Sequence, residues 1–104
     1  MTEPSVEPPP KIQIVQVDTL ATDLLALVVR CLATTRLGAR FHCVSQHGRT
    51  VELTLTEIRR YPTVTVTEVD PPHAAQLVLT GPGTGRDGLR LWAGDVLHGI
   101  NPVA

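Results

Sequence analysis

The sequence predicts an all-β domain, either a sandwich or a small barrel, and three observations support this fold class. Apolar and polar residues alternate with a period of two in several short stretches, which places alternate side chains on opposite faces of a strand. Gly and Pro residues separate these stretches about every eight to twelve residues. The chain has 104 residues, 42% of them apolar, so it can build one compact core, and no stretch forms a convincing crossover helix.

The first ten residues, MTEPSVEPPP, differ from the rest of the chain. They hold four of the nine prolines, and proline lacks the N–H group that helices and sheets need. We therefore expect a disordered, Pro-rich tail at residues 1–10 and a single β domain at residues 11–104. A Pro-rich ligand for an SH3-like domain is the alternative reading of the tail.

The first expected strand, KIQIVQVD, begins at residue 11 and contains an irregularity. Its inward positions shift from Ile12 and Ile14 to Val15 and Val17, and a β-bulge would explain that shift.

Residues 23–34, DLLALVVRCLAT, are ambiguous. Thr22 or Asp23 could cap a helix, and the apolar run does not alternate cleanly. A strand that is covered on both faces also reads as continuously apolar, and Val28 and Val29 favour a strand.

Three later segments alternate more clearly and predict half-buried antiparallel strands. They are VELTLTEI, TVTVTEV and AQLVLT, and turn-forming residues such as Gly48, Pro62 and Pro71-Pro72 separate them. The expected inward residues are Val51, Leu53, Leu55, Val64, Val66, Ala75, Leu77 and Leu79. The Trp92 side chain is expected to close one end of the domain, because large aromatic side chains dominate their local packing.

The charge of the chain is nearly balanced, with a formal net charge of -1. Binding dominated by nucleic-acid phosphates normally needs a clustered basic face, and only Arg59 and Arg60, joined by Arg49 or Arg90, could start one. The longest apolar run, residues 24–29, is far shorter than the roughly 18 to 20 residues of a membrane-spanning helix. Without a hydrophobic signal segment, we expect a cytoplasmic protein with reduced cysteines and no membrane contact.

The two cysteines are the main candidates for reactive or metal-binding side chains. Cys31 and Cys43 lie symmetrically about a turn near residue 37, so a simple hairpin would place them nearly opposite each other. In a reducing compartment we expect free thiols packed in the core, with a disulfide as the alternative. His42 and Cys43 point to opposite faces of their strand, so we expect no metal site and no cofactor. A nucleophilic pair of Cys43 with His98 has no support in the sequence.

Four segments carry a resemblance to a known family. They are TTRLGARFHCV, which turns through Gly38, VELTLTEIRRY, HAAQLVLTGPG and LRLWAGDVLHG. In their order and spacing, residues 11–100 resemble domain 2 of elongation factor Tu and related translational GTPases. This resemblance implies an all-β fold, a six- or seven-stranded antiparallel Greek-key β-barrel. The phosphate-binding pattern G-x-x-x-x-G-K-[ST] is absent, so the chain is not a GTPase.

The resemblance also implies a candidate ligand-binding site. In elongation factor Tu, a Glu and an Arg three residues later help to form the pocket for the 3′-terminal adenosine of aminoacyl-tRNA, and Glu57 and Arg60 match these positions. Arg59 and Tyr61 complete the candidate set, because a basic and aromatic patch can hold a single-stranded terminus. The alternative is a solvated charged pair at the end of an edge strand.

Together, these features predict a non-enzymatic binding module. The resemblance implies translation partners, namely aminoacyl-tRNA, the ribosome or a GTPase domain on another chain. Because a fold does not fix a function, the alternative is a protein-binding accessory subunit or a homodimer joined through an exposed strand edge.

Overall fold

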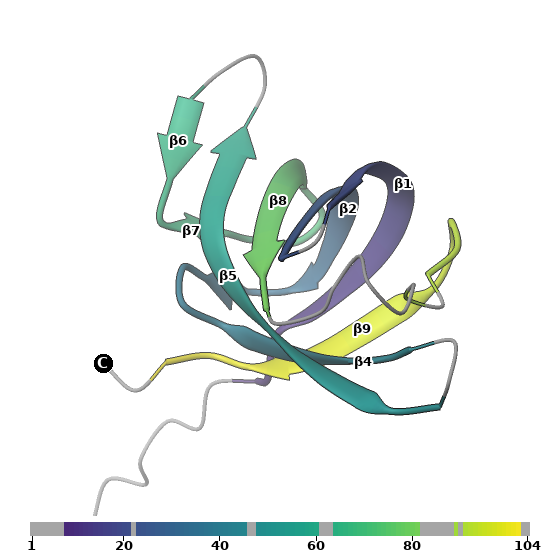
Figure 1. Cartoon of the computed structure of the whole chain (residues 1–104). Coiled ribbons are helices and arrows are strands. Elements are labelled where there is room, and N and C mark those ends of the chain that lie inside the picture. Colours follow the sequence, from purple (N-terminus) through teal and green to yellow (C-terminus); the bar gives the residue numbers. More distant parts are fainter. Residues whose placement is uncertain are drawn as a thin grey trace, which may run out of the picture.

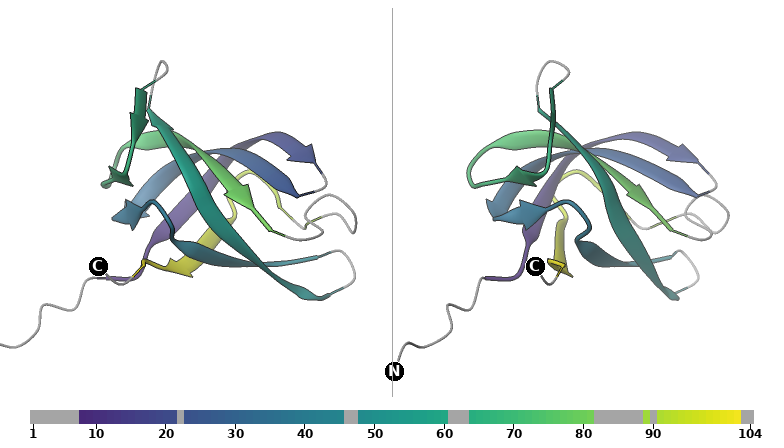
Figure 2. Two further views of the ribbon diagram at one scale, coloured as in Figure 1. Left: turned by 60° about the vertical axis from the view of Figure 1, so that its left-hand side comes forward. Right: turned by 90° about the vertical axis from the view of Figure 1, so that its left-hand side faces the viewer.

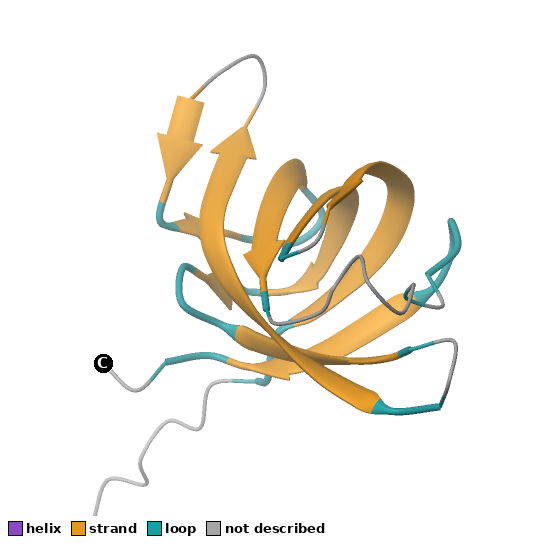
Figure 3. Cartoon of the chain, in the orientation of Figure 1, coloured by secondary structure: helices purple, strands orange, loops and turns teal. Residues whose placement is uncertain are grey.

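The computed structural model describes residues 8–21, 23–45, 48–60, 64–81, 89 and 91–102. Within these ranges it is built from β-strands and contains no helix, and therefore none that could span a membrane (Figures 1 and 3). The strands are β1 (Lys11–Ala21), β2 (Leu24–Ala33), β3 (Thr35–Arg36), β4 (Arg40–Val44), β5 (Thr50–Arg60), β6 (Val64–Val66), β7 (Glu68–Val69), β8 (Ala74–Thr80) and β9 (Val96–Ile100).

Six strands close into an antiparallel barrel in the order β4-β9-β1-β2-β8-β5, and a further pairing between β4 and β5 completes the ring. The strands β4, β5 and β8 are successive neighbours, and β9 returns to lie beside β4, which is a Greek-key connection. β6 adds a strand to β5, and together they project beyond the barrel (Figure 2). The expected antiparallel Greek-key β-barrel is confirmed.

Aliphatic side chains fill the barrel, because alternate residues of each strand point inward. β4 and β8 alternate strictly between buried and more exposed residues. Phe41 is the largest fully buried side chain. The other core residues are Ile12, Ile14, Leu25, Leu27, Val29, Cys31, Ala39, Cys43, Leu53, Leu55, Ile58, Val69, Ala75, Leu77, Leu79, Leu89 and Leu97.

The ambiguous segment at residues 23–34 forms the strand β2, as its valines favoured. β2 lies between β1 and β8, and its inward residues pack in the core. On its outer face, Ala26 is only 6% exposed and Val28 is half-buried. Partial cover of the outer face explains why this segment reads as continuously apolar.

The bulge expected in the first strand is present, but its consequence differs from the prediction. Ile14 lies opposite Val29 and Gln16 lies opposite Val28, so Val15 is the extra residue. Val15 is 50% exposed, and its predicted inward position is wrong. Val17 lies opposite the buried Leu27 yet is 37% exposed, because β9 pairs with β1 only at its first three residues.

Two further predicted positions are wrong for the same kind of reason. Val64 is 55% exposed, because the end of β6 extends past the barrel and none of the described strands lies beneath it, whereas Val66 packs against the core. Trp92 is 69% exposed in the turn before β9, so it does not close the barrel. A side chain is buried only where a neighbouring element covers it, and the local sequence pattern does not show where those elements lie.

The predicted hairpin that would place Cys31 opposite Cys43 does not form. Cys31 lies on β2 and Cys43 on β4, and these strands are not neighbours in the sheet. The chain between them instead builds the short strand β3, which pairs with β7. Both cysteines are free and buried, as expected for thiols packed in the core.

Candidate functional site

A bulge in β5 positions the charged candidates Glu57 and Arg59. Leu53 and Leu55 point into the barrel, and strict alternation would turn Glu57 and Arg59 inward as well. Leu55 lies opposite Leu79 and Glu57 lies opposite Val78, so the register shifts between them.

Thr56 is the extra residue of this bulge. Its hydroxyl oxygen Oγ1 donates a hydrogen bond to the carbonyl oxygen of Val78 at 3.2 Å. Ile58 then takes the next buried position, with no exposed surface, and Glu57 and Arg59 lie on the outer face of the barrel.

Glu57 and Arg59 form a bidentate ion pair on this outer face. Arg59 Nε donates to Glu57 Oε1 at 2.8 Å, and Arg59 Nη2 donates to Glu57 Oε2 at 3.0 Å. This hydrogen bonding holds the pKa of the Glu57 carboxyl below its ordinary value and raises the pKa of Arg59. Both groups are therefore charged at neutral pH, and the carboxylate orients the guanidinium.

The expected neighbour of Glu57, Arg60, lies on the other side of β5. In the projecting β5–β6 ribbon, Arg60 lies opposite Val64 and Ile58 lies opposite Val66. Arg60 is two residues from the inward-facing Ile58, so its side chain lies on the same, inner side of the ribbon. Residues three apart on a strand point to opposite faces, and the structure accordingly pairs Glu57 with Arg59. The fourth candidate, Tyr61, lies outside the described residues.

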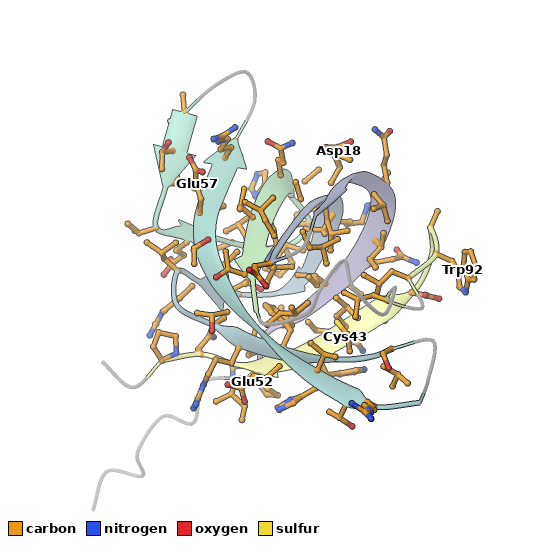
Figure 4. The ribbon with its side chains drawn as sticks, in the orientation of Figure 1. Asp18, Cys43, Glu52, Glu57 and Trp92 are labelled. Carbon is orange, nitrogen blue, oxygen red and sulfur yellow. The ribbon has the colours of Figure 1, made fainter. Side chains whose placement is uncertain are left out.

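Two polar residues extend the outer face around Arg59 and were not found from the sequence. Gln76 of β8 lies opposite Arg59, and its Nε2 donates to Asp18 Oδ2 of β1 at 2.9 Å. Glu57 and Asp18 both point outward from the barrel (Figure 4). No sequence signal identifies this contact, because Asp18 and Gln76 come from strands on either side of β2.

Arg49, one of the two residues that could have joined Arg59 and Arg60 in a basic patch, lies far from them. Arg49 precedes β5 and Arg59 is near its end, so about 30 Å of strand separates them. Arg90, the other candidate, lies outside the described residues. Other arginines face carboxylates instead: Arg36 Nε is 3.4 Å from Glu68, and Arg40 Nη1 is 4.0 Å from Glu52.

The buried thiols are poor nucleophiles at neutral pH. Burial raises the pKa of the Cys43 thiol to about 11 and also raises that of Cys31. Cys31 Sγ donates to the carbonyl oxygen of Val69 at 3.2 Å. Cys43 faces the core whereas His98 is exposed on β9, so the two do not form a pair. The described residues contain no group of His, Cys, Asp and Glu that could hold a metal ion.

No model of a protein family matches the sequence. No curated protein matches it significantly. Function is therefore inferred from the residues of this chain and from their geometry.

Proposed function

We propose that the protein is a non-enzymatic binding module, resembling the second domain of elongation factor Tu, that contacts the ends of aminoacyl-tRNA in the cytoplasm. The observation that carries this proposal is the bulge at Thr56, which turns a pre-oriented Glu57–Arg59 pair to the outer face of β5. The Greek-key barrel agrees with the fold that the resemblance implies.

The chemistry of the pair suits a single nucleoside at the end of an RNA strand. A carboxylate accepts hydrogen bonds from ribose hydroxyls or base amino groups, and a guanidinium can stack on a base or bind a phosphate. Two of the five N–H groups of Arg59 bind Glu57, so this side chain is held in place before a ligand arrives. Holding it in place reduces the entropy that binding would otherwise cost.

The balanced charge of the chain sets the expected salt dependence. Binding to nucleic acid weakens as the salt concentration rises. For each phosphate neutralised on a single strand, the logarithm of the affinity falls with a slope of about 0.7 against the logarithm of the salt concentration. Arg59 and Arg60 together then give a slope of about 1.4, far below that of a protein with an extended basic face.

Fluorescence anisotropy with a short single-stranded RNA that ends in a 3′ adenosine, with and without an esterified amino acid, tests this proposal. We expect Arg59→Ala to weaken binding by more than about tenfold. Arg60 lies on the other side of β5, so Arg60→Ala should mainly reduce the salt dependence of binding. Arg30→Ala removes the same charge from an exposed position on β2 and is the matched control, with a change below about twofold. Binding that is independent of salt, or that is unchanged by Arg59→Ala, would contradict the proposal.

A second candidate function is that of a protein-binding accessory subunit, and the exposure of Trp92 favours it. Trp is enriched among the residues that dominate protein–protein binding energies. Capture from a nuclease-treated lysate should recover a protein partner in stoichiometric amount, and Trp92→Ala should abolish that capture. Equal capture by the wild-type protein and by Trp92→Ala would refute this second function.

A further inference from the structure

Exposed apolar side chains gather along one face of the barrel. Val96 and Ile100 lie on the outer face of β9, Trp92 lies in the turn before β9, and Val15 is the bulge residue of the adjacent β1. Their exposed fractions are 38%, 55%, 69% and 50%. We call these four residues the β9 strip.

The turn that carries Trp92 is held firmly against β1. The Trp92 N–H donates to Asp95 Oδ2 at 2.8 Å, and the Asp95 N–H donates to the Trp92 carbonyl at 3.1 Å. The Ile14 N–H donates to the Asp95 carbonyl at 2.8 Å, and the Gly94 N–H donates to the Ile14 carbonyl at 2.6 Å. Trp92 is therefore an exposed aromatic group on a fixed backbone, and it points away from the barrel (Figure 4).

Opposite charges stand at the two ends of the β9 strip. Arg40 lies directly opposite Ile100 on the neighbouring strand β4. Its exposed guanidinium is 4.0 Å from Glu52 through Nη1, and its remaining N–H groups can bind a second carboxylate. Asp95 lies at the other end, in the turn with Trp92. His98 lies between these ends, on the same outer face and opposite Lys11.

We propose that a second copy of this chain covers the β9 strip in a symmetric dimer, in which the two β9 strands lie face to face and antiparallel. This arrangement rests on the protein-binding alternative above and names its partner. A two-fold axis near the middle of the strip brings Ile100 of one copy to Trp92 of the other, and Arg40 of one copy to Asp95 of the other. Each contact forms twice, as in an isologous interface.

The strip favours a second copy because its charges complement each other: Arg40 of one copy meets Asp95 of the other only when one copy is reversed. The strip has four apolar residues, against roughly 20 to 30 residues a side in a standard interface, so we expect weak association with a dissociation constant on the order of 10 μM. The Glu57–Arg59 pair stays accessible in this dimer, because β8 lies across the barrel from β9 and β5 lies next to β8.

Trp92 is the one tryptophan of the chain, so its fluorescence reports directly on the interface. Sedimentation and Trp emission are measured together on the full chain from about 1 to about 500 μM, a range that spans the expected dissociation constant. We expect a monomer with red-shifted, quencher-accessible emission at low concentration. At high concentration we expect a dimer whose emission is blue-shifted and protected.

Matched variants locate the interface. Ile100→Arg should raise the dissociation constant at least tenfold, whereas Val64→Arg, at an equally exposed valine on β6, should leave it within about twofold. Thermal unfolding checks that both variants fold, and Trp92→Ser, followed by sedimentation alone, supplies a second strip variant.

A protein that stays monomeric over the whole range, or a dimer that tolerates both Ile100→Arg and Trp92→Ser, would overturn the proposal. If an unrelated chain protects Trp92 while this protein is monomeric, the dimer is refuted and the protein-binding function stands. RNA binding is tested at Arg59 and Arg60, away from the strip, so its outcome is separate from both.

Discussion

Closure of the barrel between β4 and β9 depends on a glycine, and Gly99→Ala is the sharpest test of that closure. Gly99 lies directly opposite Phe41, the largest buried side chain. A Cβ atom at position 99 would lie 2.5 Å from the carbonyl oxygen of Arg40 and 2.7 Å from Cδ1 of Phe41. Carbon atoms in proteins do not approach this closely, so the strand or the ring has to move.

Neither neighbour can move at low cost. The Arg40 carbonyl belongs to the backbone of a paired strand, and the Phe41 ring has no exposed surface. Overpacking of this kind costs about 1 to 3 kcal/mol. Replacing Gly by Ala also raises the free energy of unfolding by about 0.4 to 1 kcal/mol, because Ala restricts the unfolded chain. We expect a net loss of about 1.3 kcal/mol, or a decrease of about 5 to 10 °C in the melting temperature of a domain of this size.

Thermal and urea unfolding of Gly99→Ala, Phe41→Leu and the double variant measure this effect. The smaller Leu side chain relieves the collision with the ring, so the two changes should be non-additive, with a coupling of at least about 0.5 kcal/mol. A melting temperature for Gly99→Ala within about 2 °C of the wild type would refute the close packing of β9 on β4.

The remaining predictions concern one thiol, one amide and the outer ion pair. The pKa of the Cys43 thiol is near 9 in the unfolded chain and about 11 in the folded protein. The free energy of unfolding should therefore be full below pH 9 and fall by about 3 kcal/mol as the pH rises to 11. Urea titrations of Cys43→Ala should not show this loss. Asn101→Ala should cost about 1 to 3 kcal/mol in urea unfolding, because it leaves the Arg36 N–H and the Thr34 carbonyl without their partner. Arg59→Ala should raise the pKa of Glu57, measured by NMR titration, with little change in stability because the pair is exposed.

Local alternation predicted most of the barrel, because each strand buries one face. The inward positions of β8 and the inner residues Leu53 and Leu55 follow from a period of two. The same period carried past Thr56 would bury Glu57 and Arg59, and burying two charged side chains is so costly that it signals a bulge. That signal was available in the sequence.

Other features depend on contacts that no local pattern contains. The contact of Asp18 with Gln76 spans β2, and the separation of Cys31 from Cys43 follows from a detour through β3. Trp92 is exposed because its turn is fixed to β1, and its chemical type alone predicted burial. Residues three apart on a strand point to opposite faces, so Glu57 and Arg60 do not share a face. The family resemblance nevertheless grouped these two residues in one site.

The bulge at Thr56 displays Glu57 and Arg59 on the surface while Ile58 turns inward. Thiol labelling tests it directly, because both native cysteines are buried and should react slowly in the folded protein. Cysteines placed singly at Glu57, Ile58 and Arg59 are compared for their rate of reaction with an aqueous disulfide reagent. We predict fast labelling at positions 57 and 59 and slow labelling at position 58. Fast labelling at 58 with protection at 57 and 59 would contradict the account.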